Sequence, residues 1–181
     1  TRYLAGTQQV LRADSETTAA LAPDIRAKVL AAAGKALDRC QVLVLSDYGK
    51  GVLGDGIAAE LIAQARAAGR PVVVDPKGTD FARYRGASVL TPNRRELGEE
   101  ARLPTTSDDD IVEAARHLAT SSDVDAVLVT RGGDGMTLVE AEAGFVHLPA
   151  EAREVFDVSG AGDTVAATLA AALAAGAELP K

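Results

Sequence analysis

Residues 159–164, Ser-Gly-Ala-Gly-Asp-Thr, have the composition of an anion-binding loop with a base beside it. Gly160 and Gly162 flank Ala161, and glycine lets a ligand approach the backbone closely. Asp163 would stand in the first turn of the following helix, where unpaired N–H groups and the helix dipole favour negative charge. A carboxylate there can accept a hydroxyl proton while the N–H groups stabilise a phosphoryl group in transfer. The run predicts phosphoryl transfer, unless it is an ordinary helix start.

Two further segments combine polar backbone or amide groups with charge at the ends of predicted strands. Residues 93–96, Asn-Arg-Arg-Glu, offer Glu96 as an oxygen ligand for Mg²⁺ or its water shell. Asn93 followed three residues later by Glu96 is also an ordinary capping box. Residues 130–135 contain three glycines and can wrap nucleotide phosphates with N–H groups, or simply turn the chain into a hairpin. Both segments are candidates for holding a nucleotide.

Charged side chains also follow the first two predicted buried strands. Asp47 and Lys50 come after the first strand, and Asp75 and Lys77 come after the second. Such side chains can bind hydroxyl groups or a phosphate, although each pair can equally belong to a solvated loop. They are candidates for contacting a polar substrate.

Hydrophobic patterning supplies a scaffold that would bring these loops together. Short apolar runs alternate with helical segments, which is typical of a parallel sheet covered by helices on both faces. The predicted strands are 7–12, 42–45, 72–74, 88–90, 124–129 and 155–156, the predicted helices are 23–38, 57–68, 93–101, 108–119 and 161–175, and 136–140 with 145–148 predicts a β-hairpin. Ligands of such three-layer α/β folds bind beyond the carboxyl ends of the strands, where the candidate residues lie.

Composition limits the class of protein. A chain of 181 residues suits one domain, and a net charge of −7 argues against nucleic acid as a partner. Cys40 is the only cysteine, so no internal disulfide or Cys-rich zinc site can form, and we expect its thiol to be buried. With no signal peptide and no long apolar run, we expect a cytoplasmic protein without membrane contact.

In their order along the chain, these motifs resemble those of the ribokinase/PfkB carbohydrate kinases. Gly160, Ala161, Gly162 and Asp163 are similar to the family's carboxy-terminal signature, which implies an anion hole and a catalytic base. Residues 93–96 are similar to its Asn-x-x-Glu motif, tied to Mg²⁺ and the ATP phosphates, and 130–135 to its nucleotide-binding loop. The nucleotide-binding residues that the resemblance implies are Asn93, Arg94, Arg95, Glu96, Thr130, Gly132, Gly135 and Asp157.

Within the family, residues 8–14, 46–51, 75–78 and 90–93 resemble the heptose 7-phosphate kinases of bacterial lipopolysaccharide synthesis. The resemblance implies ATP-dependent phosphorylation of D-glycero-β-D-manno-heptose 7-phosphate at its anomeric hydroxyl, on the route to ADP-heptose. Glu96 would bind Mg²⁺, through water. The implied substrate contacts are Arg12, Asp47, Lys50, Asp75 and Lys77.

The resemblance also implies a ribokinase-like fold: a Rossmann-like α/β core with a mainly parallel sheet, a late hairpin and part of a small lid sheet. We expect a single kinase domain, truncated at both ends, with 1–14 as a lid or edge-strand remnant and 15–181 as the core. Lid sheets in this family often pair, so a homodimer is expected at full length.

Three alternatives remain open. The substrate could be another sugar, such as a fructose phosphate or ribose, or the chain could be inactive as a fragment or binding module. A dinucleotide-binding oxidoreductase is the distant third. Its fingerprint would place a third glycine where Val165 stands, and an acidic residue that would fall beyond Lys181.

Overall fold

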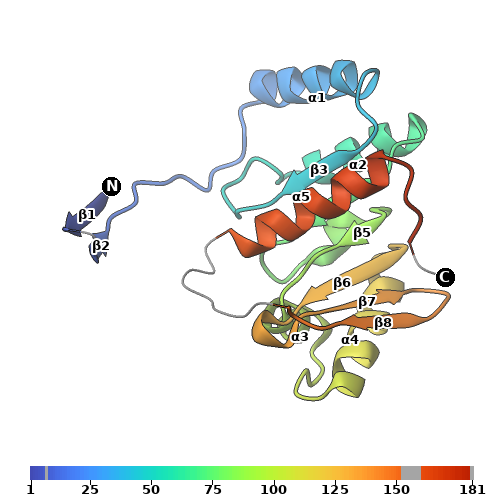
Figure 1. The fold of residues 1–181 in the computed structure, drawn as a ribbon. Helices are drawn as coiled ribbons and strands as arrows, with labels where there is room; N and C mark the ends of the chain where they lie inside the picture. The colour runs from blue at the N-terminus through green and yellow to red at the C-terminus, as the bar shows by residue number, and fades with distance from the viewer. Residues whose placement is uncertain (7, 152–159, 180–181) are drawn as a thin grey trace.

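A mostly parallel sheet forms the centre of the fold in the computed structural model, which describes residues 1–6, 8–151 and 160–179. In the described part of the chain the sheet has six strands in the order β3-β4-β5-β6-β7-β8 (Figure 1). Strands β3 to β6 are parallel, and β7 and β8 continue the sheet as an antiparallel hairpin. The bounds are Leu43–Ser46 (β3), Val72–Asp75 (β4), Val89–Leu90 (β5), Ala126–Thr130 (β6), Met136–Glu140 (β7) and Phe145–Leu148 (β8).

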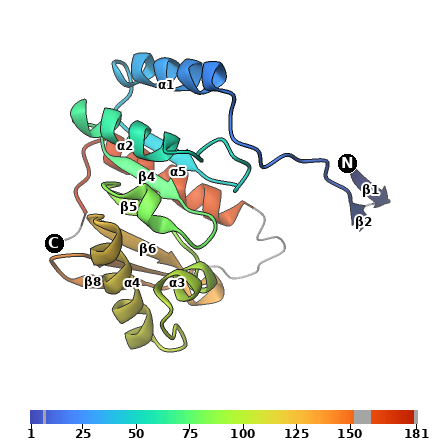
Figure 2. The ribbon, with the colours of Figure 1, turned by 180° about the vertical axis from the view of Figure 1, so that it is seen from behind.

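Helices cover both faces of this sheet. Helix α5 lies on one face, whereas α2, α3 and α4 lie on the other and α1 packs on α2 (Figures 1 and 2). The bounds are Pro23–Leu37 (α1), Ile57–Ala67 (α2), Arg94–Ala101 (α3), Asp108–Ser122 (α4) and Ala161–Ala174 (α5). The predicted three-layer α/β class with a late hairpin is therefore confirmed.

Strand β4 shows why an unbroken apolar run forms a central strand. Val72 and Val74 pack into the core beneath α1 to α4, and Val73 packs against α5 on the opposite face. Successive side chains point to opposite faces of a sheet, so a strand covered on both sides needs apolar residues at every position. All three valines are fully buried.

Helices α3 and α4 begin at local capping signals. Asn93 and Ser107 each accept a hydrogen bond from the backbone N–H three residues later, and the Glu96 and Asp110 carboxylates accept one from the cap residue's own N–H. Hydrogen bonds from the Thr106 side chain and then from Ser107 lower the pKa of Asp110 to about 2. The capping box predicted at the start of each helix is confirmed.

A small two-stranded antiparallel sheet, β1 (Arg2–Ala5) and β2 (Gln8–Arg12), lies apart from the core at the end of an extended segment (Figures 1 and 2). The small amino-terminal sheet that the resemblance implied is thus present, although the hydrophobic pattern indicated only its second strand. In the described residues no helix is both long and apolar enough to cross a membrane.

Observed boundaries of the predicted helices and core strands differ from the expected ones by at most three residues. The predicted strand 155–156 lies outside the described residues. The expectation that Cys40 is buried is wrong: its side chain is exposed because the residue lies between α1 and β3 rather than in the strand.

Candidate active site

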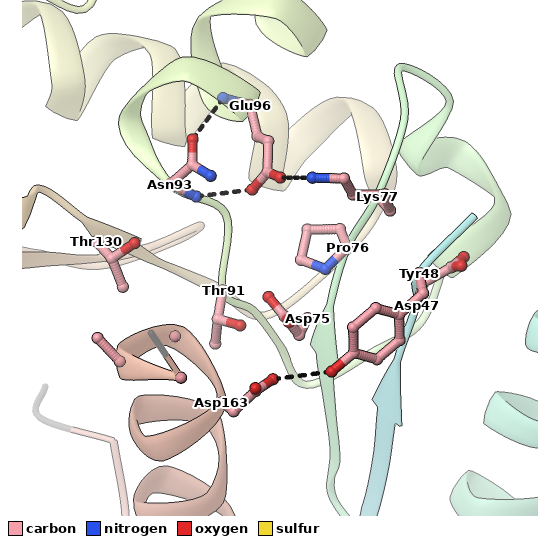
Figure 3. Close-up of a pocket in the computed structure, with 13 residues that line it drawn as sticks. Asp47, Tyr48, Asp75, Pro76, Lys77, Thr91, Asn93, Glu96, Thr130 and Asp163 are labelled. Carbon is pink, nitrogen blue, oxygen red and sulfur yellow. Dashed lines mark hydrogen bonds and ion pairs between the residues drawn. The ribbon is translucent and has the colours of Figure 1, made fainter. Parts of the chain in front are cut away.

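The carboxyl ends of the parallel strands and the amino end of α5 meet around a cavity of about 250 Å³ (Figure 3). Strand register brings the loops level: Ser46 of β3 pairs with Asp75 of β4, and a parallel bridge links Asn93 to Thr130. Because parallel strands end at the same edge of a sheet, side chains distant in sequence converge there. The cavity lies where the sequence predicted a ligand site.

The start of α5 forms one wall of the cavity. Gly160 caps the helix with a left-handed backbone (φ 78°), a conformation that favours glycine, and Ala161, Gly162 and Asp163 form the first turn. The first N–H groups of a helix have no partner within the helix, so this turn presents donors to an anion. The Tyr48 hydroxyl donates to Asp163 Oδ1 at 3.4 Å. The predicted anion hole and the predicted base thus line one cavity.

Asn93 and Glu96 stand on the opposite wall. Asn93 Oδ1 accepts from the Glu96 N–H at 2.9 Å, and Glu96 Oε2 accepts from the Asn93 N–H at 3.1 Å. The other carboxylate oxygen, Glu96 Oε1, accepts from Lys77 Nζ at 2.9 Å. This hydrogen bond and then the charge of Glu96 raise the pKa of Lys77. Helix capping therefore fixes the Glu96 carboxylate in the cavity wall, and Lys77 binds the carboxylate oxygen that the cap leaves free.

The cavity carries an excess of negative charge. Burial raises the pKa of Asp75 to about 6, and the charges of Glu96 and Asp163 add to that effect. Lys77 and a hydrogen bond with Thr91 act in the opposite direction. Four carboxylates, those of Asp47, Asp75, Glu96 and Asp163, thus line the described part of the cavity together with a single ammonium group, that of Lys77.

This donor set fits a divalent cation bound together with a phosphate ligand. In the described residues no group of three or more His, Cys, Asp or Glu side chains is arranged to hold a metal by itself. Mg²⁺ is usually held by one or two carboxylates together with water and substrate phosphates. Glu96, and Asp75 nearby, supply hard oxygen ligands of that kind.

Asp47 lines the cavity, but its carboxylate is already occupied. Its Oδ1 accepts from the Gly49 N–H at 2.7 Å, and its Oδ2 accepts from the Tyr84 hydroxyl at 2.7 Å and lies 2.8 Å from Arg83 Nη2. Burial, followed by the hydrogen bond to Asp47, raises the pKa of Tyr84, so the phenol stays protonated. Asp47 therefore anchors its loop.

The predicted site residues did not include Tyr48, Pro76 and Thr91, which line the cavity, or Arg83 and Tyr84, which hold Asp47. Arg83 and Tyr84 belong to a short 3₁₀ turn, Phe81–Tyr84, that no periodic pattern indicates. Tyr48 follows Asp47 in a glycine-containing loop, and this position beside a candidate residue was the only sequence feature that could have indicated a site role for Tyr48.

Among the described residues, six predicted site residues lie outside the cavity lining: Arg12, Lys50, Arg94, Arg95, Gly132 and Gly135. Arg12 is on the separate hairpin and pairs with Asp14 at 2.8 Å. Lys50 pairs with Glu16 and lines a neighbouring hollow on β3. Arg95 follows the helical turn away from the cavity and pairs with Glu99 at 2.7 Å, its side chain 84% exposed.

The predicted nucleotide loop is held at both ends. Arg94 Nη2 lies 2.5 Å from Asp134 Oδ2, which ties α3 to a 3₁₀ turn at Gly132–Asp134. Gly135 has φ 86°, and a Cβ there would lie 2.0 Å from the Leu148 carbonyl oxygen, so only glycine fits. Thr130 lines the cavity, and Asp157 lies outside the described residues.

Comparison with protein families gives a match over nearly the whole chain. The sequence model described as pfkB family carbohydrate kinase matches residues 6–181. The chain belongs to the pfkB family of carbohydrate kinases. The predicted family is thereby confirmed, and the kinase interpretation is favoured over the dinucleotide-binding one.

Curated relatives extend the similarity. The protein named Bifunctional protein HldE from Rhodospirillum rubrum is 59% identical over 179 residues, which is 99% of this pfkB chain and 36% of the relative. The protein of the same name from Paramagnetospirillum magneticum is 59% identical over 181 residues, 100% of this chain and 37% of the relative. The chain therefore spans little more than a third of the length of these relatives.

Solved structures show the same fold. A mutant of phosphofructokinase-2 from Escherichia coli superposes with a TM-score of 0.78 at 23% identity, covering 96% of this chain and 56% of that chain. Arabidopsis thaliana ribokinase complexed with ribose and ATP gives a TM-score of 0.67 at 24% identity, covering 88% of this chain and 48% of that one. The ribokinase-like fold is confirmed.

Proposed function

We propose that this chain carries the kinase site of an enzyme that phosphorylates D-glycero-β-D-manno-heptose 7-phosphate with ATP at the anomeric hydroxyl. The product would be the 1,7-bisphosphate, on the route to ADP-heptose and the lipopolysaccharide core. The observation that carries the kinase proposal is the convergence of Asp163 and the first turn of α5 with Glu96 around one cavity. The choice of heptose is supported by the motifs at 46–51 and 75–78 and by the relatives named HldE.

Asp163 would act as the base. It accepts the proton of the anomeric hydroxyl as that oxygen attacks the γ-phosphorus of ATP. A new O–P bond forms, the bond from the γ-phosphorus to the β,γ-bridging oxygen breaks, and ADP leaves with the electron pair. The N–H groups of Ala161, Gly162 and Asp163 would donate to the oxygens of the transferring group, where its charge must be stabilised.

The opposite wall would hold the nucleotide. Asn93 and Thr130 line the cavity, and Arg94 through Asp134 fixes the neighbouring turn. Glu96 would hold Mg²⁺ through water, and the ion would neutralise phosphate charge when bound. Asp75 and Lys77 line the cavity between the two walls and would face the sugar or the transferring phosphate.

A second copy of the chain is the proposed partner. The small β1–β2 sheet exposes Tyr3, Leu4, Val10 and Leu11, each at least 53% exposed. Apolar side chains gathered on two short strands gain stability when another surface covers them. We infer that two such sheets pair in a homodimer of the full-length gene product.

Replacing Asp163 with Asn tests the base. In the full-length gene product we expect Asp163→Asn to lower kcat by about 10³-fold, within the range for loss of a general base, while ATP affinity changes by less than about twofold. Asp24→Asn is the matched control, because Asp24 also lies in a first helical turn but on α1. Turnover of Asp163→Asn within about tenfold of wild type would contradict the role of Asp163.

A substrate panel tests the sugar separately. Heptose 7-phosphate, fructose 6-phosphate and ribose are compared by kcat/KM in a coupled ADP assay. A higher kcat/KM for either of the other two would overturn the heptose assignment and leave the kinase chemistry intact. No ADP formation with any sugar would count against the kinase itself.

A further inference from the structure

Lys77 has a fixed backbone and an exposed charged end. Its N–H donates to the Tyr84 hydroxyl at 3.3 Å, and its carbonyl accepts from Arg83 Nη2 at 2.6 Å. The same two residues hold the buried Asp47 carboxylate. The Lys77 side chain is 56% exposed, so the ammonium group can move on a flexible four-carbon stem while its base stays in place.

Glu96 is held much more tightly than its lysine partner. Its side chain is 13% exposed, and Oε2 is committed to the capping box with Asn93. Its Oε1 accepts a hydrogen bond from Lys77 Nζ at 2.9 Å. A cation that approaches Glu96 from the cavity through Oε1 therefore competes with the Lys77 ammonium for that oxygen.

Charge balance gives that competition a direction. Lys77 is the single Lys or Arg among the described residues that line the cavity, which also holds the carboxylates of Asp47, Asp75, Glu96 and Asp163, and its ammonium group points at Glu96 (Figure 3). A nucleotide phosphate adds further negative charge to this space. A divalent cation binds hard carboxylate oxygens more strongly than a hydrated ammonium group does, so it can take the place of Lys77 at Glu96.

We propose that Lys77 is the resident counter-ion of Glu96, which yields that carboxylate to the divalent cation arriving with ATP and then contacts the transferring phosphoryl group. This inference rests on the function proposed above and adds a specific role for Lys77. Before ATP binds, the ammonium group balances part of the negative charge of the cavity's carboxylates. When ATP is bound, it supplies a positive charge where negative charge develops on the phosphoryl group. Lys77 is then a catalytic residue as well as a counter-ion.

Lys77→Met separates the two roles, because methionine keeps most of the stem and removes the charge. We measure Mn²⁺ affinity of the nucleotide-free, full-length gene product from the EPR signal of free Mn²⁺, and kcat with ATP and the sugar phosphate. Loss of the competing ammonium should tighten Mn²⁺ binding by about two- to fivefold, as for an exposed ion pair. Loss of a charge at the transferring group should lower kcat by about 10²-fold or more.

Two variants complete the design. Lys28→Met removes an exposed lysine that pairs with Asp24 at 3.2 Å on α1, and should change neither quantity by more than about twofold. Lys77→Arg keeps the charge and should recover at least about a tenth of wild-type kcat. A purely structural role for Lys77 would not tighten metal binding while turnover falls.

Mn²⁺ affinity of Lys77→Met that is unchanged or weaker would overturn the counter-ion role, and kcat within about threefold of wild type would overturn the phosphate contact. Failure of the wild-type protein to bind Mn²⁺ would reject both this exchange and the metal role of Glu96. If no sugar is phosphorylated although Lys77→Met tightens Mn²⁺ binding, the proposed function fails and the exchange at Glu96 stands.

Discussion

Removing the Tyr84 hydroxyl should destabilise the fold even though the packing of the aromatic ring is kept. Tyr84 is fully buried, its ring packs edge-on against Phe81 with centroids 5.8 Å apart, and phenylalanine would keep that packing. The hydroxyl donates to the Asp47 carboxylate at 2.7 Å. A hydrogen bond to a charged group contributes about 1.5–3 kcal/mol, so we expect Tyr84→Phe to lower the free energy of unfolding by about 2 kcal/mol. For a chain of this size that lowers Tm by roughly 4–8 °C.

Urea unfolding followed by far-UV circular dichroism measures this loss, with an unchanged dependence on urea showing that the same surface unfolds. Tyr48→Phe is the matched control, since it removes a hydroxyl from a side chain that is 64% exposed and should cost less than about 0.5 kcal/mol. Asp47→Asn should cost about 3 kcal/mol, because Arg83 then loses the charge of its buried partner.

The double variant decides whether Tyr84 and Asp47 act together. Groups in one hydrogen-bond network are not additive, so Tyr84→Phe with Asp47→Asn should lose at least about 1 kcal/mol less than the sum of the single losses. Additive losses, or a loss below about 0.5 kcal/mol for Tyr84→Phe, would refute the account of Asp47 as a buried anchor of its loop.

The remaining predictions concern Asp75 and the predicted nucleotide loop, residues 130–135. The pKa of Asp75 is raised from 3.8 to about 6, so ionisation of this carboxyl opposes folding. The contribution of the protonated carboxyl to the free energy of unfolding is complete below pH 3.8 and is lost as pH rises through about 6. After allowance for solvent screening, Asp75→Asn should therefore stabilise the protein by about 1 kcal/mol at pH 7.5 and have little effect at pH 3.5. Thermal melts measure the difference, and equal effects at the two pH values would contradict this expectation. Gly135→Ala should lower the free energy of unfolding by more than about 2 kcal/mol, because its Cβ would meet the Leu148 carbonyl, whereas Gly144→Ala, with no atom within 4 Å, should be near neutral in the same melts. Equal melting temperatures for these two glycine variants would show that the loop backbone yields.

Local patterns predicted much of this fold. The valine run of β4 predicts a strand covered on both faces. The cap residues Asn93 and Ser107 lie three positions before their capping-box partners, Glu96 and Asp110. Both signals are contained in a few consecutive residues. The strand ends, and with them the place of the cavity, follow from the same patterns because parallel strands share one edge.

Long-range contacts could not be predicted in this way. The bond between Tyr84 and Asp47 joins residues 37 positions apart, and only packing decides that this carboxylate serves the fold. Lys50 and Lys77 follow strand ends in similar loops, yet the first pairs with Glu16 and the second with Glu96 in the cavity. The type of a side chain indicates which chemistry it could perform. The direction in which that side chain points is set by neighbours from elsewhere in the chain.

The spacing of the cavity residues has a consequence for synthesis. Tyr48 and Asp163 meet in the cavity but lie 115 residues apart along the chain. At roughly 5–20 residues per second, Asp163 is made on the order of 6–23 seconds after Tyr48. During that interval the loops after β3 and β4 emerge without the helix that completes their cavity. A ribosome-bound intermediate can therefore form part of the sheet before the proposed base, Asp163, has been made.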